Sequence, residues 1–238
     1  SKQTQCGYYN LITKKDFLAT TINQYINDIK FITHMDYLGN ITPVNNNGQS
    51  WSIIDKSGNT INSGVESVTK GEISKAWAFC KNDTWKAYNW QGEKILGDKN
   101  YEGIIFPLTE DNKDVYVIKE NGKWGTVDKE GKQLIPCTYE QASAPSYGWI
   151  IVKKDGKYGV IDINNKSIIP REYENIISNT YKYPDCMWVM KDSLWYNYNI
   201  VSQSISEDGY KVVVSNFDNG YSLVQPNNMT VGETVLSR

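Results

Sequence analysis

The sequence has little of what metal-dependent and nucleophilic enzymes commonly use. It holds one histidine, His34, and four cysteines that lie 74, 57 and 49 residues apart with no CxxC pair. A zinc site of ordinary ligand spacing is therefore not expected, and no other metal or cofactor is expected either. The spacing does not decide whether disulfides form among the cysteines, which are Cys6, Cys80, Cys137 and Cys186.

The chain also lacks a long apolar run and an excess of one charge. Its longest apolar stretch, around Trp149–Val152, has the length of a strand and falls far short of the roughly 20 residues that cross a bilayer. Its 25 basic and 27 acidic residues give a net charge of −2. Nucleic-acid binding needs a clustered positive field, so a nucleic-acid partner is not expected. Because the apolar stretch is too short, a membrane-spanning segment is not expected either.

What the sequence does contain is an internal repeat. Residues 119–140 align with residues 153–174 at an offset of 34, and ten of the 22 aligned positions are identical. A fixed period of this size indicates a repeat architecture. Aromatic or equivalent positions extend the register to six units, which are headed near Trp51, Trp85, Trp124, Tyr158, Trp195 and Thr230.

Each repeat contains the residues that turns between short strands need. Asn121-Gly122 and Asp155-Gly156 predict two-residue type I′ hairpins, which need positive φ at both central residues. An Asp or Asn then opens a second turn that closes on a left-handed residue, Gly131, for which Asn165 stands in the next copy. Gly131→Val is therefore expected to destabilise the protein by about 1–2 kcal/mol, and Gly131→Asn is expected to cost much less.

The ends of the repeat also carry expectations about strands. Gly125 and Gly159 follow the aromatic position, where a glycine lets a neighbouring ring or backbone approach closely. Pro136 and Pro170 are expected to end the pairing of the fourth strand, because proline cannot donate to a sheet. The recurring Tyr-Glu pair then opens the next unit, so each unit holds four short strands in an up-and-down meander.

These motifs resemble the bacterial WG (KWG) repeat family. Gly122-Lys123-Trp124-Gly125-Thr126-Val127-Asp128, followed by Ile135-Pro136, carries the resemblance, and the second copy keeps the frame with Tyr158 in place of Trp. The match is specific over about 115–176 and weak elsewhere. It implies a β-repeat protein, often secreted or surface-exposed, with no catalytic activity shared by the family and no catalytic residues to carry over.

The expected fold is an all-β tandem repeat. We predict a propeller-like ring of about six small four-stranded blades, with a capped β-solenoid of stacked meanders as the alternative. Residues 1–45 are predicted to form an N-terminal helical or capping segment, with one amphipathic helix over about 15–31, and residues 46–238 to form the repeat domain. The oligomeric state is left open.

A repeat also helps to separate structural from functional residues. A catalytic group is needed once, so residues that recur in every unit are more simply structural. The candidates for binding are aromatics that break the pattern, because loops on a rigid scaffold commonly carry binding groups. They are Tyr181, Tyr183, Trp188, Trp77 and Trp90, with Trp149 expected in the core.

The function predicted from these features is a binding or scaffold module without catalytic activity. A protein partner is favoured, and the alternatives are a glycan-binding surface protein and a toxin-neutralising, immunity-type protein. The chain starts at Ser1 without a methionine. A secreted or surface-anchored location, with the signal removed, is favoured over the cytoplasm.

Overall fold

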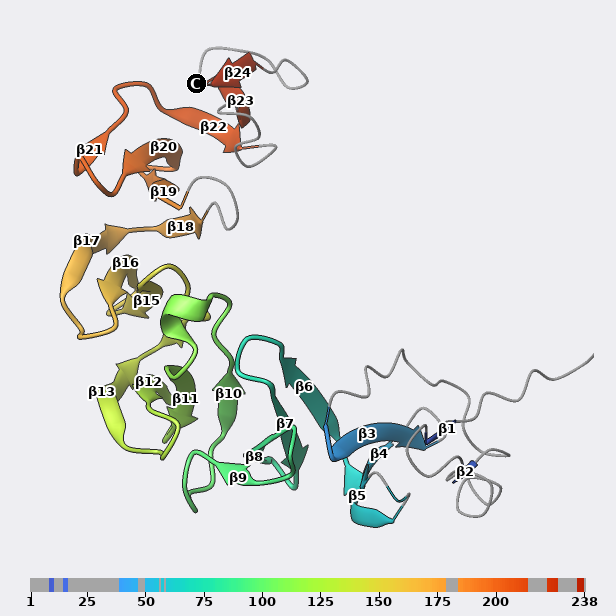
Figure 1. The fold of residues 1–238 in the computed structure, drawn as a ribbon. Coiled ribbons are helices and arrows are strands. Elements are labelled where there is room, and N and C mark those ends of the chain that lie inside the picture. The colour runs from blue at the N-terminus through green and yellow to red at the C-terminus, as the bar shows by residue number, and fades with distance from the viewer. Residues whose placement is uncertain are drawn as a thin grey trace, which may run out of the picture. The chain divides into compact units, whose positions relative to one another are not determined.

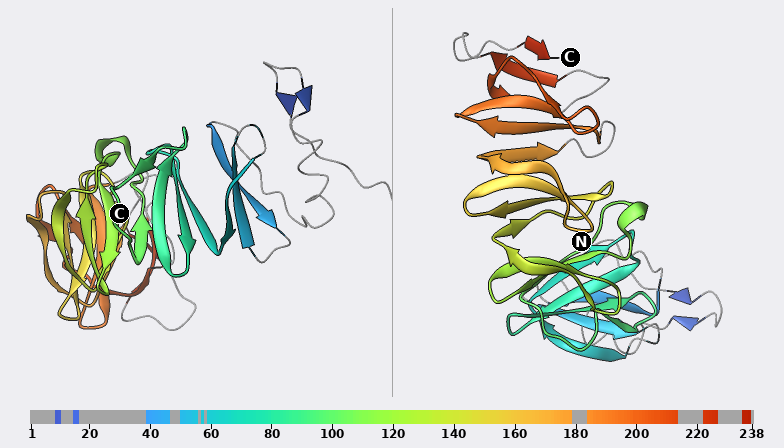
Figure 2. Two further views of the ribbon diagram at one scale, coloured as in Figure 1. Left: turned by 90° about the horizontal axis from the view of Figure 1, so that it is seen from below. Right: turned by 90° about the vertical axis from the view of Figure 1, so that its left-hand side faces the viewer.

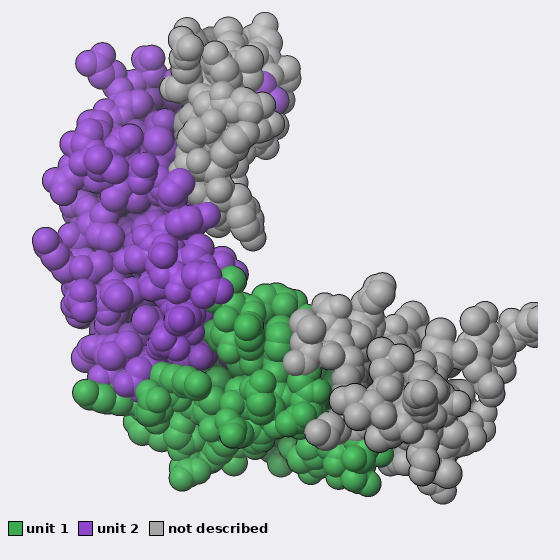
Figure 3. Space-filling model, in the orientation of Figure 1, with its two compact units in different colours: residues 1–104, 129–132 green, residues 105–128, 133–238 purple. Residues whose placement is uncertain are grey.

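The computed structural model describes an all-β chain (Figure 1). The described residues are 9–10, 15–16, 39–46, 50–55, 57, 59–178, 184–213, 222–226 and 235–237. Within them the one helical element is a single 3-10 turn, η1 (Glu110–Asn112). The chain divides into two compact units, residues 1–104 with 129–132 and residues 105–128 with 133–238 (Figure 3).

The helix expected over 15–31 is not confirmed. Its first two positions form the short strand β2 (Lys15–Asp16), which pairs antiparallel with β1 (Tyr9–Asn10). The rest of the expected helix, together with Cys6 and His34, lies outside the described residues.

The first compact unit contains two meander sheets whose strands follow chain order. The first has the order β3-β4-β5 and the second β6-β7-β8-β9, and every pairing is antiparallel. The strands are β3 (Ile41–Asn46), β4 (Ser50–Asp55), β5 (Thr60–Val65), β6 (Ser67–Gly71), β7 (Ala76–Lys81), β8 (Thr84–Asn89) and β9 (Lys94–Ile95).

The rest of the chain continues the same plan (Figure 2). The next two sheets have four strands each, in the orders β10-β11-β12-β13 and β14-β15-β16-β17. These strands are β10 (Gly103–Ile105), β11 (Tyr116–Glu120), β12 (Lys123–Val127), β13 (Gln133–Tyr139), β14 (Gln141–Ala142), β15 (Trp149–Lys154), β16 (Lys157–Asp162) and β17 (Ser167–Tyr173). Four-stranded meanders of this kind are the building blocks of propellers.

The last sheet departs from the expected plan. It runs β18-β19-β20-β22-β23-β24, with β21 also paired to β20, so the final strands extend the fifth sheet instead of forming a sheet of their own. Thr230, the expected head of a sixth unit, lies outside the described residues. Five sheets of three or more strands are described, so the six-bladed ring is not confirmed. The strands are β18 (Asn175–Ser178), β19 (Cys186–Lys191), β20 (Leu194–Asn199), β21 (Ser204–Ile205), β22 (Tyr210–Val213), β23 (Ser222–Pro226) and β24 (Val235–Ser237).

The predicted type I′ hairpins are confirmed and recur between the second and third strands of other sheets. Asn121 and Gly122 have φ of 52° and 72°, and Asp155 and Gly156 have 53° and 76°. The same signs occur at 82–83 and 192–193, where the sequence has no glycine. The positive twist of this turn matches the twist of the strands that it joins, which is why the backbone adopts it even without glycine.

A recurring glutamate explains how these turns are held. The Glu140 carboxylate accepts the backbone N–H groups of Asp155 and Gly156, at 2.9 and 3.3 Å. Glu174 does the same for Asp192 and Ser193, at 3.0 and 3.2 Å. The glutamate of each Tyr-Glu pair thus caps the hairpin of the sheet that it opens, which gives it the structural role expected from its recurrence.

The expectation that proline ends the fourth strand is wrong. Both β13 and β17 continue past Pro136 and Pro170. Each strand bulges at its proline, so the pairing does not require a hydrogen bond from the proline nitrogen. Trp124 lies opposite Tyr139 but Thr126 lies opposite Ile135, so four residues on one strand face two on the other. The bulge folds over Gly125.

The second turn of each repeat is built as predicted around an Asp or Asn. Asp162 Oδ1 accepts the N–H groups of Asn164 and Lys166, at 2.9 and 2.7 Å. The left-handed residues are Gly92, Gly131 and Asn165, with φ of 91°, 83° and 67°. Equivalent side chains that accept N–H groups within their own turns are those of Asp55, Asn89 and Asn199.

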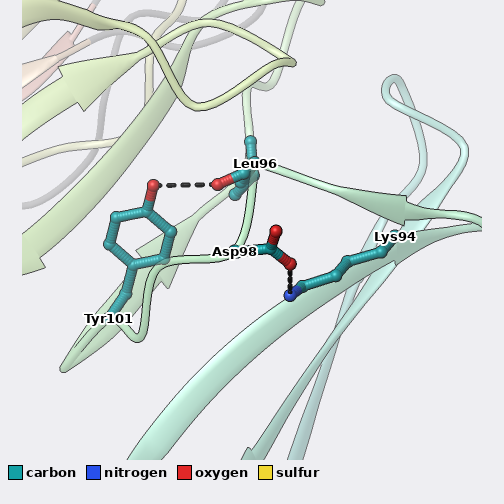
Figure 4. Close-up of polar contacts among 4 residues, drawn as sticks. All are labelled: Lys94, Leu96, Asp98 and Tyr101. Atoms are coloured by element: carbon teal, nitrogen blue, oxygen red, sulfur yellow. Dashed lines mark hydrogen bonds and ion pairs between the residues drawn. The ribbon is translucent and has the colours of Figure 1, made fainter.

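The turn at 129–131 also packs against an earlier sheet. The Leu96 N–H donates to the Lys129 carbonyl at 2.7 Å, and a Cβ on Gly131 would overlap the Leu96 carbonyl. The segment that follows Leu96 is held by Tyr101, whose hydroxyl donates to the Leu96 carbonyl at 3.0 Å beside the Lys94–Asp98 ion pair (Figure 4). Gly131 is therefore fixed by close backbone contact as well as by its φ.

Apolar side chains from successive sheets form the core. One cluster joins the sheets of β14–β17 and β18–β20 and includes Trp149, Ile169, Tyr173 and Met187. Trp149 is 4% exposed, in line with its expected place in the core. In another cluster of the same kind, Ile135 packs with residues of the following sheet.

A pair of glycine substitutions tests the turn at 131. Gly131→Asn is expected to destabilise the protein by about 2 kcal/mol or more, because its side chain meets the Leu96 backbone. Gly122→Asn is the matched control, since it also has positive φ but has no atom within 4 Å of an added Cβ. Urea unfolding measures both, and equal penalties would contradict the packing contact.

The buried phenol of Tyr173 gives a second test. Burial raises the pKa of Tyr173 to about 12, whereas a tyrosine in an unfolded chain ionises near pH 10. Stability from this group is thus complete below pH 10 and is lost as the pH rises towards 12. We expect Tyr173→Phe to show a smaller fall in unfolding free energy over this window than the wild type, measured by urea unfolding at several pH values.

Candidate functional site

Each meander sheet has two ends with different contents. The hairpin end carries the type I′ turns and the capping glutamates, and the loop end carries the first-to-second connections and the third-to-fourth turns. Of the five aromatics predicted to bind, Trp77 and Trp90 lie at the loop end of the β6–β9 sheet. Tyr181 and Tyr183 lie outside the described residues.

Trp77 and Trp90 are brought together by a lysine. The Lys70 ammonium lies 5.7 Å from the Trp77 ring centroid and 5.6 Å from that of Trp90, within the range of a cation–π interaction. The same ammonium pairs with Glu72 at 2.5 Å. Trp77 is half-buried and also packs against the apolar cluster of Ile53 and Phe79. The two indoles are therefore already occupied by groups of this chain.

Trp90 has a structural role. It is 7% exposed, and its carbonyl accepts the N–H of Asn40 at 2.6 Å. A Cβ on Gly39 would overlap the Trp90 backbone, so this stretch of chain lies tightly against it. Trp90 anchors the start of the first sheet and offers little surface to a ligand.

Trp188 lies in the core, where a ligand has no access to it. Its exposure is 0%, and it packs with Trp195 and Val224. Its ring meets that of Tyr210 edge to face, with centroids 5.8 Å apart. It stands in the second strand of its sheet and faces the strands that follow, an arrangement that the local sequence does not reveal.

The loop end of the β14–β17 sheet presents an aromatic that the sequence analysis missed. Tyr147 and Gly148 form a two-residue turn between Ser146 and Trp149, whose backbones exchange hydrogen bonds of 3.0 and 2.9 Å. Tyr147 has φ of 49°, which a bulky residue rarely adopts. The sequence signal was present in Tyr-Gly after Ser146, but aromatic residues at this turn position are too unusual to predict.

Two side chains from the η1 segment hold this strained turn. The Tyr147 N–H donates to Thr109 Oγ1 at 2.9 Å, and the Gly148 N–H donates to Asn112 Oδ1 at 2.9 Å. Asn112 is 1% exposed and Thr109 also donates to its side-chain oxygen, so the latch is largely withdrawn from water. Backbone strain of this kind persists only where the surroundings over-determine it, and it is common at functional sites.

The result is a small mixed surface, which we call the Tyr147 surface. It comprises the Tyr147 ring, which is partly exposed and also packs against Trp149, the Leu108 side chain at 47% exposure, and the exposed acidic residues Glu110 and Asp111. Leu108 is fixed next to the turn, because its N–H donates to the Pro145 carbonyl at 2.9 Å. An aromatic and an aliphatic side chain held on rigid backbone, with charges at the rim, are the usual parts of a protein-binding surface.

Two of the described cysteines, Cys80 and Cys186, are free thiols. Burial raises the pKa of both, which disfavours the reactive thiolate. The described residues contain no group of three or more His, Cys, Asp or Glu side chains placed to hold a metal ion. None of the helices described is long and apolar enough to cross a membrane.

Comparison with known families identifies the central repeats. The family model described as "WG containing repeat" matches two adjacent copies, at residues 124–158 and 158–195. Residues 124–195 are WG repeats. The resemblance seen in the sequence is thereby confirmed for this part of the chain.

Comparison with solved structures shows similarity at low identity. A "crystal structure of the eukaryotic initiation factor" is 11% identical with a TM-score of 0.50, and the alignment covers 79% of this chain and 57% of that one. Hsv2 from Kluyveromyces lactis is 9% identical (TM-score 0.47, 78% and 66% covered), and BamB from Moraxella catarrhalis is 9% identical (TM-score 0.41, 84% and 74% covered). A search of curated proteins finds no match.

The geometry explains the two residues that name the WG repeat. The aromatic is held under a lysine of the preceding strand, with Lys119 Nζ 5.8 Å from the Trp124 centroid and Lys153 Nζ 5.2 Å from that of Tyr158. The glycine is needed because the bulged fourth strand crosses it: a Cβ on Gly125 would lie 2.5 Å from the Ile135 carbonyl oxygen. Both residues of the WG pair are therefore structural.

The strain at Tyr147 can be tested by an exchange that relieves it. Tyr147→Asn is expected to change the unfolding free energy by no more than about 1 kcal/mol, because Asn adopts positive φ more easily and this offsets the lost contact with Trp149. Asn112→Ala is expected to lower it by about 1–3 kcal/mol, since it leaves the partly buried Gly148 N–H without its acceptor. Thermal and urea unfolding measure both. A large loss of stability in Tyr147→Asn would show that the ring is needed for packing.

Proposed function

We propose that this chain is a non-catalytic binding module that recognises a protein through the Tyr147 surface. The strained and doubly latched Tyr147 turn carries the proposal. The Tyr147 ring packs partly against the core, with its centroid 6.5 Å from that of Trp149, but Gly or Asn would form the same turn without the strain of positive φ on a bulky residue. The latch holds the ring in one orientation in the free chain, so little conformational entropy is lost when a partner binds.

The recurring polar residues support a scaffold role for the rest of the chain. Glu140 and Glu174 cap hairpins, and Asp162 closes a turn. These carboxylates already accept hydrogen bonds from backbone N–H groups, which accounts for their recurrence without a catalytic role. The four-stranded sheets also support the propeller-like ring as the proposed assembly of the repeats, ahead of the solenoid.

The acidic rim suggests the chemistry of the partner. Glu110 and Asp111 are exposed beside Leu108. Rim charges of one sign steer a partner of opposite charge and set the association rate. We therefore expect a partner surface with an apolar centre and basic residues around it. A toxin bound and neutralised by this surface would be one such partner.

A glycan is the weaker candidate. Sugars stack on a free aromatic face, but Trp77 has Lys70 over its ring and the Ile53–Phe79 cluster against it. Trp90 and Trp188 are buried. In the part of the chain that the structure describes, the tryptophans predicted to bind thus present no open stacking platform.

The test begins with affinity capture on the immobilised chain and identification of captured proteins by mass spectrometry. Dissociation constants are then measured with the purified partner. Tyr147→Asn and Leu108→Ser are expected to weaken binding at least tenfold without loss of melting temperature, since anchor residues contribute about 2 kcal/mol or more. Leu134→Ser and Val201→Ser are the controls, because both side chains are exposed apolar groups elsewhere and should have no effect.

Three outcomes would overturn the proposal. One is partner binding that survives both Tyr147→Asn and Leu108→Ser. Another is specific binding on a glycan array with no protein captured. The third is a chemical turnover that is abolished by a single Asp or Glu substitution in a variant that stays folded.

A further inference from the structure

One position of the repeat carries a different residue in the first sheet. The third-strand residues Ala87, Thr126 and Val160 lie opposite Ile95, Ile135 and Ile169 of the fourth strand, and these isoleucines are all buried. In the first sheet the same pairing is Ile53 with Asn62. A polar amide thus stands where the other sheets place a core isoleucine, and it is only partly buried.

A pocket lies at this substitution. It has a volume of about 110 Å³, and its walls come from the first two sheets. Ile41 and Ile53 contribute from the first sheet, and Phe79 and Tyr88 from the second. Ile61, which is 57% exposed, also lines it, together with Asn62 and Gly92. The corresponding isoleucines of the other sheets are buried, so we attribute the pocket to the change at position 62.

A positive charge lies next to the polar wall of the pocket, on Lys81, which bonds to the lining residue Asn62 without lining the pocket itself. The Lys81 ammonium donates to Asn62 Oδ1 at 3.3 Å and to the Ser63 carbonyl at 2.7 Å. Among the described residues no carboxylate forms an ion pair with Lys81, and the Glu66 carboxylate accepts the Asn82 N–H at 3.0 Å. Since the amide oxygen is bound to Lys81, the Asn62 Nδ2 group is left as a donor beside an apolar cavity.

We propose that this pocket binds a carboxylate attached to a short branched aliphatic group. The aliphatic group enters among Ile41, Ile53 and Phe79, and the carboxylate accepts from Asn62 Nδ2 and pairs with Lys81. The volume suits about four or five carbon atoms, since a cavity of about 150 Å³ holds a whole benzene ring. Charge and shape together select this class over neutral or bulkier ligands.

The same chemistry occurs in two sources. One is a free branched-chain carboxylic acid, and the other is the C-terminal residue of a polypeptide that ends in leucine, isoleucine or valine. Capture of a terminal carboxylate is a known mode of peptide recognition. The site is separate from the Tyr147 surface, so this inference stands whether or not that surface binds a protein.

The experiment titrates the full chain with N-acetyl-leucine and follows chemical shifts of the backbone amides. Binding is expected with a dissociation constant of about 1 mM, in keeping with a ligand of this size. Shifts should concentrate at residues 61–62, 79 and 88. N-acetyl-leucinamide, which lacks the charge, and N-acetyl-alanine, which lacks the branched group, are each expected to bind at least threefold more weakly. Equal affinity for all three compounds, or no binding, would overturn the proposal.

Two further ligands separate the sources. If 4-methylpentanoate binds as tightly as an acetylated tetrapeptide ending in leucine, the site takes a free acid. If the tetrapeptide binds at least tenfold more tightly, and its amidated form does not, the site takes a chain terminus. Tight binding of both the free and the amidated tetrapeptide would contradict a carboxylate site.

Variants of the chain itself complete the test. Asn62→Ile restores the residue of the other sheets and is expected to reduce binding at least tenfold while the melting temperature holds or rises. Lys81→Gln is expected to weaken binding about threefold, as for an exposed charge pair. Lys94→Gln is the matched control, since it removes another exposed lysine of the same sheet, one that pairs with Asp98. Undiminished binding by Asn62→Ile would refute the site.

Discussion

Each sheet depends on how its fourth strand bends over its third. In the sheets after the first, the aromatic of the third strand lies opposite a tyrosine, as Trp124 does with Tyr139 and Trp195 with Tyr210, whereas Trp51 lies opposite Val65. Closer to the turn, the pairing register slips, and the extra residues pass over the position after the aromatic. At Gly125 and Gly159 a side chain would collide with the fourth strand, which is the reason for glycine in the WG pair. The fifth sheet solves the same constraint differently: Tyr196 occupies the position, and Gly209 on the opposite strand makes room for its ring.

The recurring polar groups all take part in hydrogen bonds that hold this arrangement together. The Tyr-Glu pair places its tyrosine against the third strand and its glutamate over the next hairpin, where the carboxylate neutralises two N–H groups that would otherwise be without partners. Hairpins at 82–83 and 192–193 keep positive φ without glycine. The carboxylates of Glu66 and Glu174 accept backbone N–H groups of these two turns, and these hydrogen bonds offset part of the backbone strain.

The sheets differ from one another at two places that the shared strand pairing leaves unconstrained, the connection between the first two strands and the edge strand. The connection between the first two strands can lengthen without disturbing the ladder, and in the third sheet it contains η1, whose Asn112 and Thr109 reach the Tyr147 turn. The fourth strand lies at the edge of its sheet, so an isoleucine there can be exchanged for Asn62 at the cost of a pocket. The two proposed binding sites arise from these two freedoms, one in a loop and one at a strand edge.

The sequence alone determined the repeat, the β class, the hairpins at 121–122 and 155–156, and the structural role of the recurring residues. These follow from local chemistry, because a turn residue sets the φ and ψ of its own backbone and the alternation of apolar residues shows which face of a strand is buried. It did not determine the path of the fourth strand through Pro136, the burial of Trp188, or the contact between Leu96 and Gly131. Those depend on which strand lies opposite and which sheet lies behind. The same holds for the Tyr147 surface and the pocket at Asn62, whose residues lie far apart in sequence. Only the packing of one sheet against the next brings them together, and that packing is set by the sum of many weak apolar contacts, which no short stretch of sequence encodes.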